Sequence, residues 1–219
     1  WRKLAPLLLI LNFLLLLMVF IPGVGIEVGE ARRWIGFGGF QIQPAEFTKL
    51  AMIVFSAAFL SKKSIRMDNF WNSSFIPLAV MGLSFLFILK QPDLGTGLVV
   101  AAVVGVIIFA AGIPYKQLFF LFITCLPMVL YLALGAEYRM KRIFSFLDPW
   151  ADPLGTGYHI IQSLYALGPG GLFGVGLGRS RQKLYYLPEP QNDFIFAIIG
   201  EELGFLGAVT IMLLFFILF

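Results

Sequence analysis

Long apolar runs recur along this chain and limit what it can fold into. The first, residues 4–21, is almost entirely apolar and follows Arg2 and Lys3. An α-helix needs roughly 20 such residues to cross the hydrocarbon core of a bilayer. Only 13% of the 219 residues are charged, whereas soluble domains carry about 25%. The sequence therefore predicts a membrane protein rather than a soluble domain.

Six apolar runs predict a polytopic, all-α membrane helical bundle with six spans. The runs cover residues 4–21, 44–60, 75–89, 98–111, 118–134 and 193 to the end. Residues 27–43 carry acids, arginines, glycines and Trp34, which is typical of an interfacial loop. Asp93 lies just before the fourth run and is expected to cap its helix. We expect residues 1–219 to be one membrane domain, taken from inside a longer polytopic protein.

Residues 136–192, between the fifth and sixth spans, contain no membrane-length run. A connection this long is expected to be a functional loop. Within it, residues 158–167 have apolar positions at helical spacing, which predicts a short amphipathic helix at the membrane interface. Gln162 and Ser163 lie on its polar face and are candidate substrate contacts. The glycines that follow either bind phosphate through their backbone amides or form a flexible hinge.

Charged residues in or beside the spans are candidate site residues. Glu46 and Lys49 are three residues apart on one helical face, which predicts an ion pair with a structural role. Glu201 and Glu202 fall inside the sixth apolar run, so at least one of them must meet a polar cavity or a basic partner. Asp193 opens that run, where it is either a helix cap or a catalytic carboxylate.

Four cations are candidates for binding an anionic substrate: Arg32, Arg33, Arg142 and Lys183. The alternative for the first two is contact with lipid headgroups beside Trp34. A single cysteine excludes an intrachain disulfide, and a single histidine argues against a histidine metal site, so no protein metal site is expected. Nucleic-acid binding is not supported, because no basic run is interleaved with aromatic residues in a soluble module.

Three stretches resemble the SEDS family of cell shape, division and sporulation proteins. They are ARRWIGFGGFQIQPAEFTKLA at 31–51, QPDLGTG at 91–97, and a long block at 146–207 that begins FLDPWADPLGTGYHIIQ. Within that block, QKLYYLPEPQNDFIFA is most similar to the FtsW and SpoVE branch of the family. His159 and Asn192 depart from residues that are common in the family, and neither departure touches an assigned role.

The resemblance implies a peptidoglycan glycosyltransferase, a multi-pass protein of the bacterial inner membrane that polymerises lipid II. It implies that Asp193 is the catalytic aspartate and that Glu46 and Lys49 are the paired Glu and Lys of the family. It also implies that residues 136–192 are extracytoplasmic, whereas counting Lys and Arg by the positive-inside rule favours the opposite side. The implied partners are lipid II, a lipid-linked glycan, a class B penicillin-binding protein that crosslinks the product, and other division or elongation membrane proteins.

The residue analysis and the family resemblance together give a mechanism in which Asp193 is the general base for the 4-hydroxyl of the acceptor N-acetylglucosamine. That hydroxyl attacks the anomeric carbon of a glycan held on undecaprenyl diphosphate, and the cations stabilise the leaving diphosphate. No cofactor is assigned, and a divalent cation, Mg²⁺ or Mn²⁺, is an alternative source of positive charge. The alternative functions are a lipid II flippase, which the intramembrane acids would suit, and a non-catalytic division scaffold.

Overall fold

The computed structural model is mostly helical and describes residues 1–28, 31–37, 40–62, 68–182 and 193–218. The chain forms two compact units, Trp1–Leu132 and Ala133–Phe219. The boundary lies a few residues before the start of the predicted loop at 136–192. Each unit has its own internal packing.

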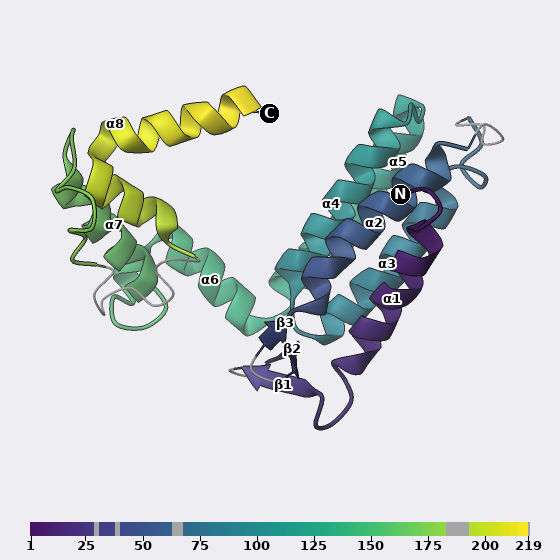
Figure 1. Cartoon of the computed structure of the whole chain (residues 1–219), viewed down its shortest axis with the longest axis horizontal. Helices are drawn as coiled ribbons and strands as arrows, with labels where there is room; N and C mark the ends of the chain where they lie inside the picture. Colours follow the sequence, from purple (N-terminus) through teal and green to yellow (C-terminus); the bar gives the residue numbers. More distant parts are fainter. Residues whose placement is uncertain (29–30, 38–39, 63–67, 183–192, 219) are drawn as a thin grey trace. The chain divides into compact units, whose positions relative to one another are not determined.

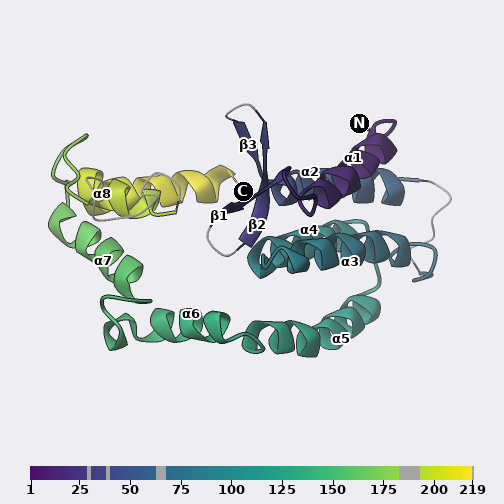
Figure 2. The same ribbon diagram turned by 90° about the horizontal axis from the view of Figure 1, so that it is seen from below.

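The first unit is built on four neighbouring helices: α1 (Ala5–Met18), α2 (Pro44–Leu60), α3 (Phe75–Lys90) and α4 (Leu94–Ala110). They run side by side with the strands at one end (Figure 1), and α1 with α2 forms one layer over a second layer of α3 with α4 (Figure 2). α5 (Tyr115–Leu134) follows α4 along the chain. The bounds of α2 are those that the sequence predicts, and α4 begins four residues earlier than expected because Asp93 caps it there.

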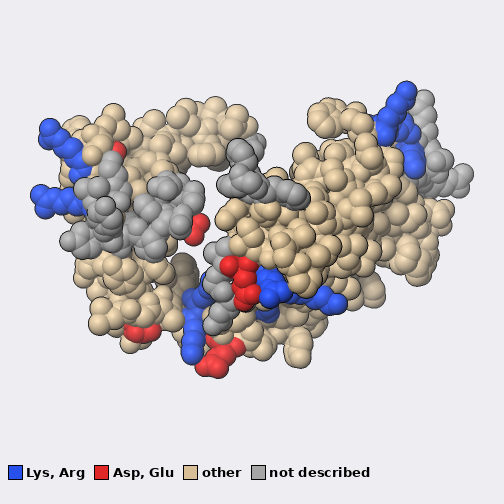
Figure 3. All heavy atoms as spheres, turned by 60° about the horizontal axis from the view of Figure 1, so that its bottom comes forward, with Lys and Arg blue, Asp and Glu red and all other residues tan. Residues whose placement is uncertain are grey.

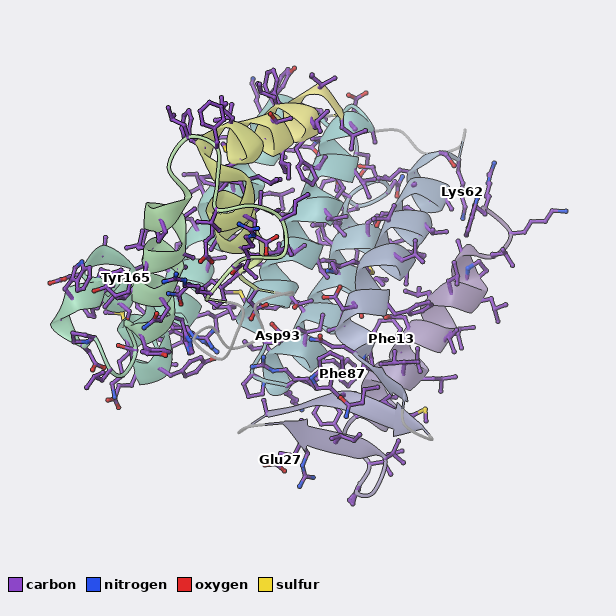
Figure 4. The ribbon with its side chains drawn as sticks, turned by 60° about the vertical axis from the view of Figure 1, so that its left-hand side comes forward. Phe13, Glu27, Lys62, Phe87, Asp93 and Tyr165 are labelled. Atoms are coloured by element: carbon purple, nitrogen blue, oxygen red, sulfur yellow. The ribbon has the colours of Figure 1, made fainter. Side chains whose placement is uncertain are left out.

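The core of this unit is apolar, and a hydrogen bond between two polar side chains is buried within it. Leu16, Met52, Ile88 and Val104 are fully buried in one cluster of side chains. The rings of Phe13 and Phe87 meet edge to face, with centroids 6.2 Å apart (Figure 4). The polar contact joins α1 to α2: the buried Thr48 hydroxyl donates a 2.7 Å hydrogen bond to Asn12 Oδ1. A hydrogen bond at such a site holds two apolar helices in one register.

Three short strands replace the interfacial loop expected at 27–43, so the all-α prediction is wrong for this segment. β1 (Gly25–Val28), β2 (Ala31–Phe37) and β3 (Phe40–Ile42) form an antiparallel sheet in that order. Counting apolar residues in membrane-length windows does not detect strands this short. Their backbone groups pair with one another, which satisfies the polar atoms that an irregular segment beside apolar helices would leave unpaired.

The second unit contains α6 (Glu137–Leu147), the short 3-10 helix η1 (Pro149–Ala151), α7 (Tyr158–Gly170) and α8 (Ile195–Leu218). The helix predicted at 158–167 is confirmed as α7, which runs three residues further. α7 packs on the first half of α8 (Figure 1). The two backbones approach closely at Gly170 and Gly200, where a Cβ on Gly170 would overlap the carbonyl oxygen of Gly200. Ile161 and Ala166 of α7 are buried, whereas Leu164 and Tyr165 are about half exposed.

α8 is not one continuous helix, because Gly204 interrupts it with φ +69° and ψ −168°. This region of backbone space is open essentially to glycine alone. The break frees the amides of Phe205 and Leu206, which donate to the carbonyls of Gly171 and Leu172 at 2.8 and 3.2 Å. The freed carbonyls of Glu201 and Glu202 accept from the amides of Val175 and Gly176 at 2.9 and 3.0 Å. The glycine-rich segment, which we define as residues 171–181, is therefore bonded into the break.

In the part of the chain that the structure describes, α5 and α8 are long and apolar enough to cross a membrane. α1, α3 and α4 are apolar but shorter. No described residue of α5 is buried, and Phe119, Phe120 and Tyr131 are all more than two-thirds exposed. Figure 3 shows uncharged residues over most of the face drawn, with charged side chains gathered into separate groups. Such broad apolar surfaces on helices are expected to contact lipid or partner helices.

The contact between Asn12 and Thr48 generates a stability prediction. Thr48→Val keeps the side-chain shape but leaves Asn12 buried without its donor, which costs about 1–3 kcal/mol of unfolding free energy. Thr48→Ser keeps the hydroxyl and is expected to lose less. The double variant Asn12→Leu, Thr48→Val should recover much of the loss, because both polar groups are gone. Thermal unfolding in detergent measures all three, and equal stability of the valine and serine variants would contradict the assigned role of this hydrogen bond.

The break in α8 generates a second prediction. Gly204→Ala forces an L-residue into a glycine-only conformation, at roughly 1–3 kcal/mol. Its Cβ would also overlap the amide nitrogen of Gly174 and the carbonyl oxygen of Leu172. The matched control is Gly105→Ala in α4, where a Cβ meets no atom within 4 Å. That control should stabilise the helix by about 0.5–1 kcal/mol. Thermal unfolding in detergent measures the stability of both variants. A Gly204→Ala variant that is at least as stable as Gly105→Ala would disprove the requirement for glycine at the break.

Candidate functional site

Asp193 lies two residues before α8 begins at Ile195, and its side chain is exposed. Among the described residues, none donates a hydrogen bond to its carboxylate and none forms an ion pair with it. The first backbone bonds of the helix instead use the carbonyl of Phe194, which accepts from Ala197 and Ile198. Of the two alternatives for Asp193, the cap is therefore absent from the described contacts, and no described residue bonds to either carboxylate oxygen.

Asp93 shows what a capping aspartate looks like in this chain. Its Oδ1 accepts from the amide of Thr96 at 3.1 Å, and its Oδ2 accepts from the Thr96 hydroxyl at 2.8 Å. Gln43, just before α2, donates from Nε2 to the same Oδ2 at 3.1 Å. The predicted cap is confirmed, and Asp93 also joins the start of α4 to the start of α2, near the strands (Figure 4).

Arg32 and Arg33, predicted to bind an anion, both have partners within the first unit. Arg32 Nε lies 2.9 Å from Glu27 Oε2, and the two residues face each other across β1 and β2. Glu27 projects from the side of the sheet away from the helices (Figure 4). Arg33 donates to the carbonyls of Gln91 and Pro92, at 2.9 and 2.6 Å. Arg33 therefore fastens β2 to the end of α3.

Glu46 and Lys49 form an ion pair on α2, with Lys49 Nζ 2.6 Å from Glu46 Oε2. The three-residue spacing places both side chains on one helical face, as expected. Lys49 is 32% exposed and Glu46 is 55% exposed, so the pair is accessible rather than enclosed within this chain. An accessible pair of this kind can also exchange its partners for a charged ligand.

The carboxylates of Glu201 and Glu202 accept hydrogen bonds from backbone amides and a hydroxyl. Glu201 is 2% exposed, and its carboxylate accepts from the Ser180 hydroxyl at 2.5 Å and from the Arg181 amide at 2.9 Å. Glu202 accepts from the amides of Gly178 and Ser180 at 2.9 and 3.2 Å. Hydrogen bonds to an ionised acceptor are among the stronger ones in proteins. The two acids therefore hold the end of the glycine-rich segment.

These contacts bear on the prediction that the glycines bind phosphate. In the glycine-rich segment the amides of Val175, Gly176, Gly178, Ser180 and Arg181 already donate within the chain. The anions bound by this backbone are the two carboxylates of α8. The sequence signal was the run of glycines near basic residues, and it did not indicate that acids of the following helix would accept from this backbone.

The remaining predicted residues lie in the second unit. Arg142 is exposed on α6, and Gln162 is half-buried on α7. Ser163 donates its hydroxyl to the carbonyl of Ile160, one turn back in its own helix. Lys183 lies outside the residues that the structure describes, so its prediction stays a prediction. The first three residues come from one unit but are not joined by any contact within the described parts of the chain.

A turn at Asp152 shapes the segment before α7. Its carboxylate accepts from the amides of Thr156 and Gly155 and from the Thr156 hydroxyl. The hydrogen bond from the Thr156 amide is the main reason that the pKa of Asp152 lies below its usual value. The turn is therefore stabilised at neutral pH, and this stabilisation is lost only as the pH falls through the lowered pKa.

Within the described ranges, no three of His, Cys, Asp and Glu come together in a group that could hold a metal ion. The described surroundings of Asp193 supply a single carboxylate. The described residues around Asp193 therefore do not form a metal site by themselves.

Comparison with known proteins identifies close relatives over the whole chain. Stage V sporulation protein E of Bacillus subtilis (strain 168) is 54% identical over 219 residues, which cover 100% of this chain and 60% of that protein. A protein named probable peptidoglycan glycosyltransferase FtsW, from Trichlorobacter lovleyi, is 47% identical and is covered over 57% of its length. The chain therefore spans somewhat over half the length of the curated relatives it matches.

Solved structures agree in fold. A chain from a study of how a peptidoglycan synthase complex coordinates polymerization and crosslinking superposes with a TM-score of 0.74 at 30% identity, covering 99% of this chain and 59% of that one. The rod shape determining protein RodA of Thermus thermophilus superposes with a TM-score of 0.62 at 28% identity, covering 99% of this chain and 54% of that one. The family model described as "Cell cycle protein", for FtsW, RodA and SpoVE, matches residues 1–219. The chain belongs to this FtsW, RodA and SpoVE family, the SEDS family that its sequence resembles.

Proposed function

We propose that this chain acts in a peptidoglycan glycosyltransferase that polymerises lipid II, with Asp193 as its general base. Relatives that carry the name peptidoglycan glycosyltransferase FtsW match the chain along its whole length. The observation that carries the proposal is the carboxylate of Asp193, which is exposed at the start of an apolar helix and free of a capping hydrogen bond to any described residue. A carboxylate that capped the helix would have fewer lone pairs available to accept a hydrogen bond or a proton from a substrate.

In the proposed reaction, Asp193 takes the proton of the acceptor 4-hydroxyl as that oxygen attacks the anomeric carbon of the donor. A bond forms between the acceptor oxygen and the anomeric carbon while the bond from that carbon to the phosphate oxygen breaks. Undecaprenyl diphosphate leaves with the electron pair, and inversion at the carbon gives a β-1,4 linkage. General-base catalysis of this kind contributes about 10²–10⁴-fold in rate.

The membrane arrangement is part of the same proposal. Six spans would be formed by α1 to α5 and α8, with residues 136–192 on the extracytoplasmic side of a bacterial inner membrane. The broad exposed apolar surfaces of α5 and of the second half of α8 support a lipid environment. The solved complex that couples polymerization to crosslinking supports a class B penicillin-binding protein as the partner. Lipid II and the growing lipid-linked glycan are the proposed substrates.

The test compares two aspartates that differ in role. Asp193→Asn removes the base but keeps the size of the side chain, so we expect lipid II polymerisation by the full-length protein to fall at least about 100-fold. Asp93→Asn is the matched control, because asparagine caps a helix about as well as aspartate. That control should keep both fold and activity. Gel analysis of glycan strands made from purified lipid II measures both variants.

Other outcomes separate the rival functions. Full polymerisation by Asp193→Asn would refute the catalytic assignment. Transbilayer movement of lipid II in liposomes, without polymer, would favour a flippase instead. If wild-type protein neither polymerises nor moves lipid II, even with its penicillin-binding protein present, the scaffold alternative replaces the enzyme.

A further inference from the structure

A cavity of about 650 Å³ lies beside the glycine-rich segment in the second unit. Pro169, Val175, Arg179, Arg181, Gln182 and Glu201 line it. Its size falls in the range of small-ligand sites, roughly 300–1,000 Å³. All six residues belong to the described part of the chain, and none of the first five was a predicted site residue. We call it the Arg179–Arg181 cavity.

The two arginines of this cavity differ from Arg32 and Arg33 in the contacts that their side chains make with described residues. In the first unit, Glu27 and the carbonyls at the end of α3 occupy those guanidinium groups. Neither Arg179 nor Arg181 donates a side-chain hydrogen bond or forms an ion pair with any residue that the structure describes. The acids beside them do not take these donors, since Glu201 and Glu202 already accept from Gly178, Ser180 and Arg181.

The backbone that carries these arginines is held in place. Val175 and Gly176 bond to the break in α8, and the amides of Ser180 and Arg181 bond to the carboxylates of Glu202 and Glu201. The side chain of Arg179 lies against Gly176, whose φ is +104°. A site on fixed backbone loses less conformational entropy when a ligand binds, which raises affinity. Two arginines from a hydrogen-bonded segment therefore line the cavity.

The residues that line the cavity indicate the chemical class of its ligand. Guanidinium groups match phosphate oxygens through paired N–H donors. Pro169 and Val175 add an apolar wall, which suits a ligand that is part lipid. The side-chain oxygen of Gln182 is buried and has no donor among the described residues, and such an acceptor is satisfied by a hydroxyl of the kind that sugars carry. The combination fits a phosphorylated sugar attached to an apolar chain.

We propose that the Arg179–Arg181 cavity binds the diphosphate of a polyprenyl-linked sugar. This inference rests on the proposed function, because it assigns the leaving group of that reaction to two arginines outside the predicted set. Phosphate groups of ordinary anionic lipids share the chemistry, and the experiment separates the two sources.

The experiment measures binding without turnover, on the full-length protein in phosphatidylcholine nanodiscs. The probes are undecaprenyl diphosphate, undecaprenyl monophosphate and phosphatidylglycerol. We expect Arg179→Gln and Arg181→Gln each to weaken binding of the diphosphate about ten-fold or more, since each removes a charge-assisted contact. Arg181→Lys should fall between wild type and Arg181→Gln, because lysine keeps the charge but not the paired donors. Lys141→Gln, in the same unit but outside the cavity, is the control and should bind like wild type.

Three results would overturn the inference. One is unchanged diphosphate binding by the double variant Arg179→Gln, Arg181→Gln, with thermal unfolding showing that it is folded. The second is an equal loss in Lys141→Gln. The third is an equal loss for phosphatidylglycerol and diphosphate, which would mark a general lipid-headgroup contact. A protein that binds the diphosphate through these arginines yet makes no polymer would refute the proposed function and leave this inference standing.

Discussion

The second unit depends on an exchange of backbone hydrogen bonds at Gly204. In an unbroken helix the amides of Phe205 and Leu206 would bond to the carbonyls of Glu201 and Glu202. Here all four groups bond to the glycine-rich segment instead. A broken helix in an apolar setting is tolerated only where protein satisfies the freed groups. The glycine-rich segment therefore satisfies the backbone groups that the break in α8 exposes, and those groups in turn hold the segment in place. The carboxylates of Glu201 and Glu202 add further hydrogen bonds to the same segment.

Polar contacts at helix ends organise the first unit in a comparable way. Arg33 donates to the carbonyls of Gln91 and Pro92, just after α3, while Asp93 bonds to the first turn of α4 and to Gln43. These contacts gather the ends of α2, α3 and α4 beside the sheet. The helices themselves meet through apolar side chains, which specify direction poorly. Charged and amide groups at their ends supply the geometric constraint that apolar packing lacks.

Much of this could be predicted from local sequence, and the rest could not for physical reasons. The bounds of α2, the existence of α7 and the cap at Asp93 follow from signals within a few residues, such as Pro44 at a helix start. The sheet was missed because its strands are short and their pairing, not their composition, stabilises them. The partners of Glu201 lie about 20 residues away, and no local pattern encodes a contact over that separation. Arg179 and Arg181 were not among the predicted site residues, because the cations of a loop cannot be told apart from sequence until their neighbours are known.

The hydrogen bond from the Arg181 amide to the Glu201 carboxylate joins two points of the chain that are 20 residues apart. It closes a ring that contains Lys183 and Asp193, whatever conformation the residues between them take. The entropy of ring closure grows only with the logarithm of its length, about 0.6 kcal/mol for each doubling. The number of residues inside the ring can therefore change at little cost in ring-closure free energy, while the hydrogen bond to Glu201 keeps the two ends of the ring together.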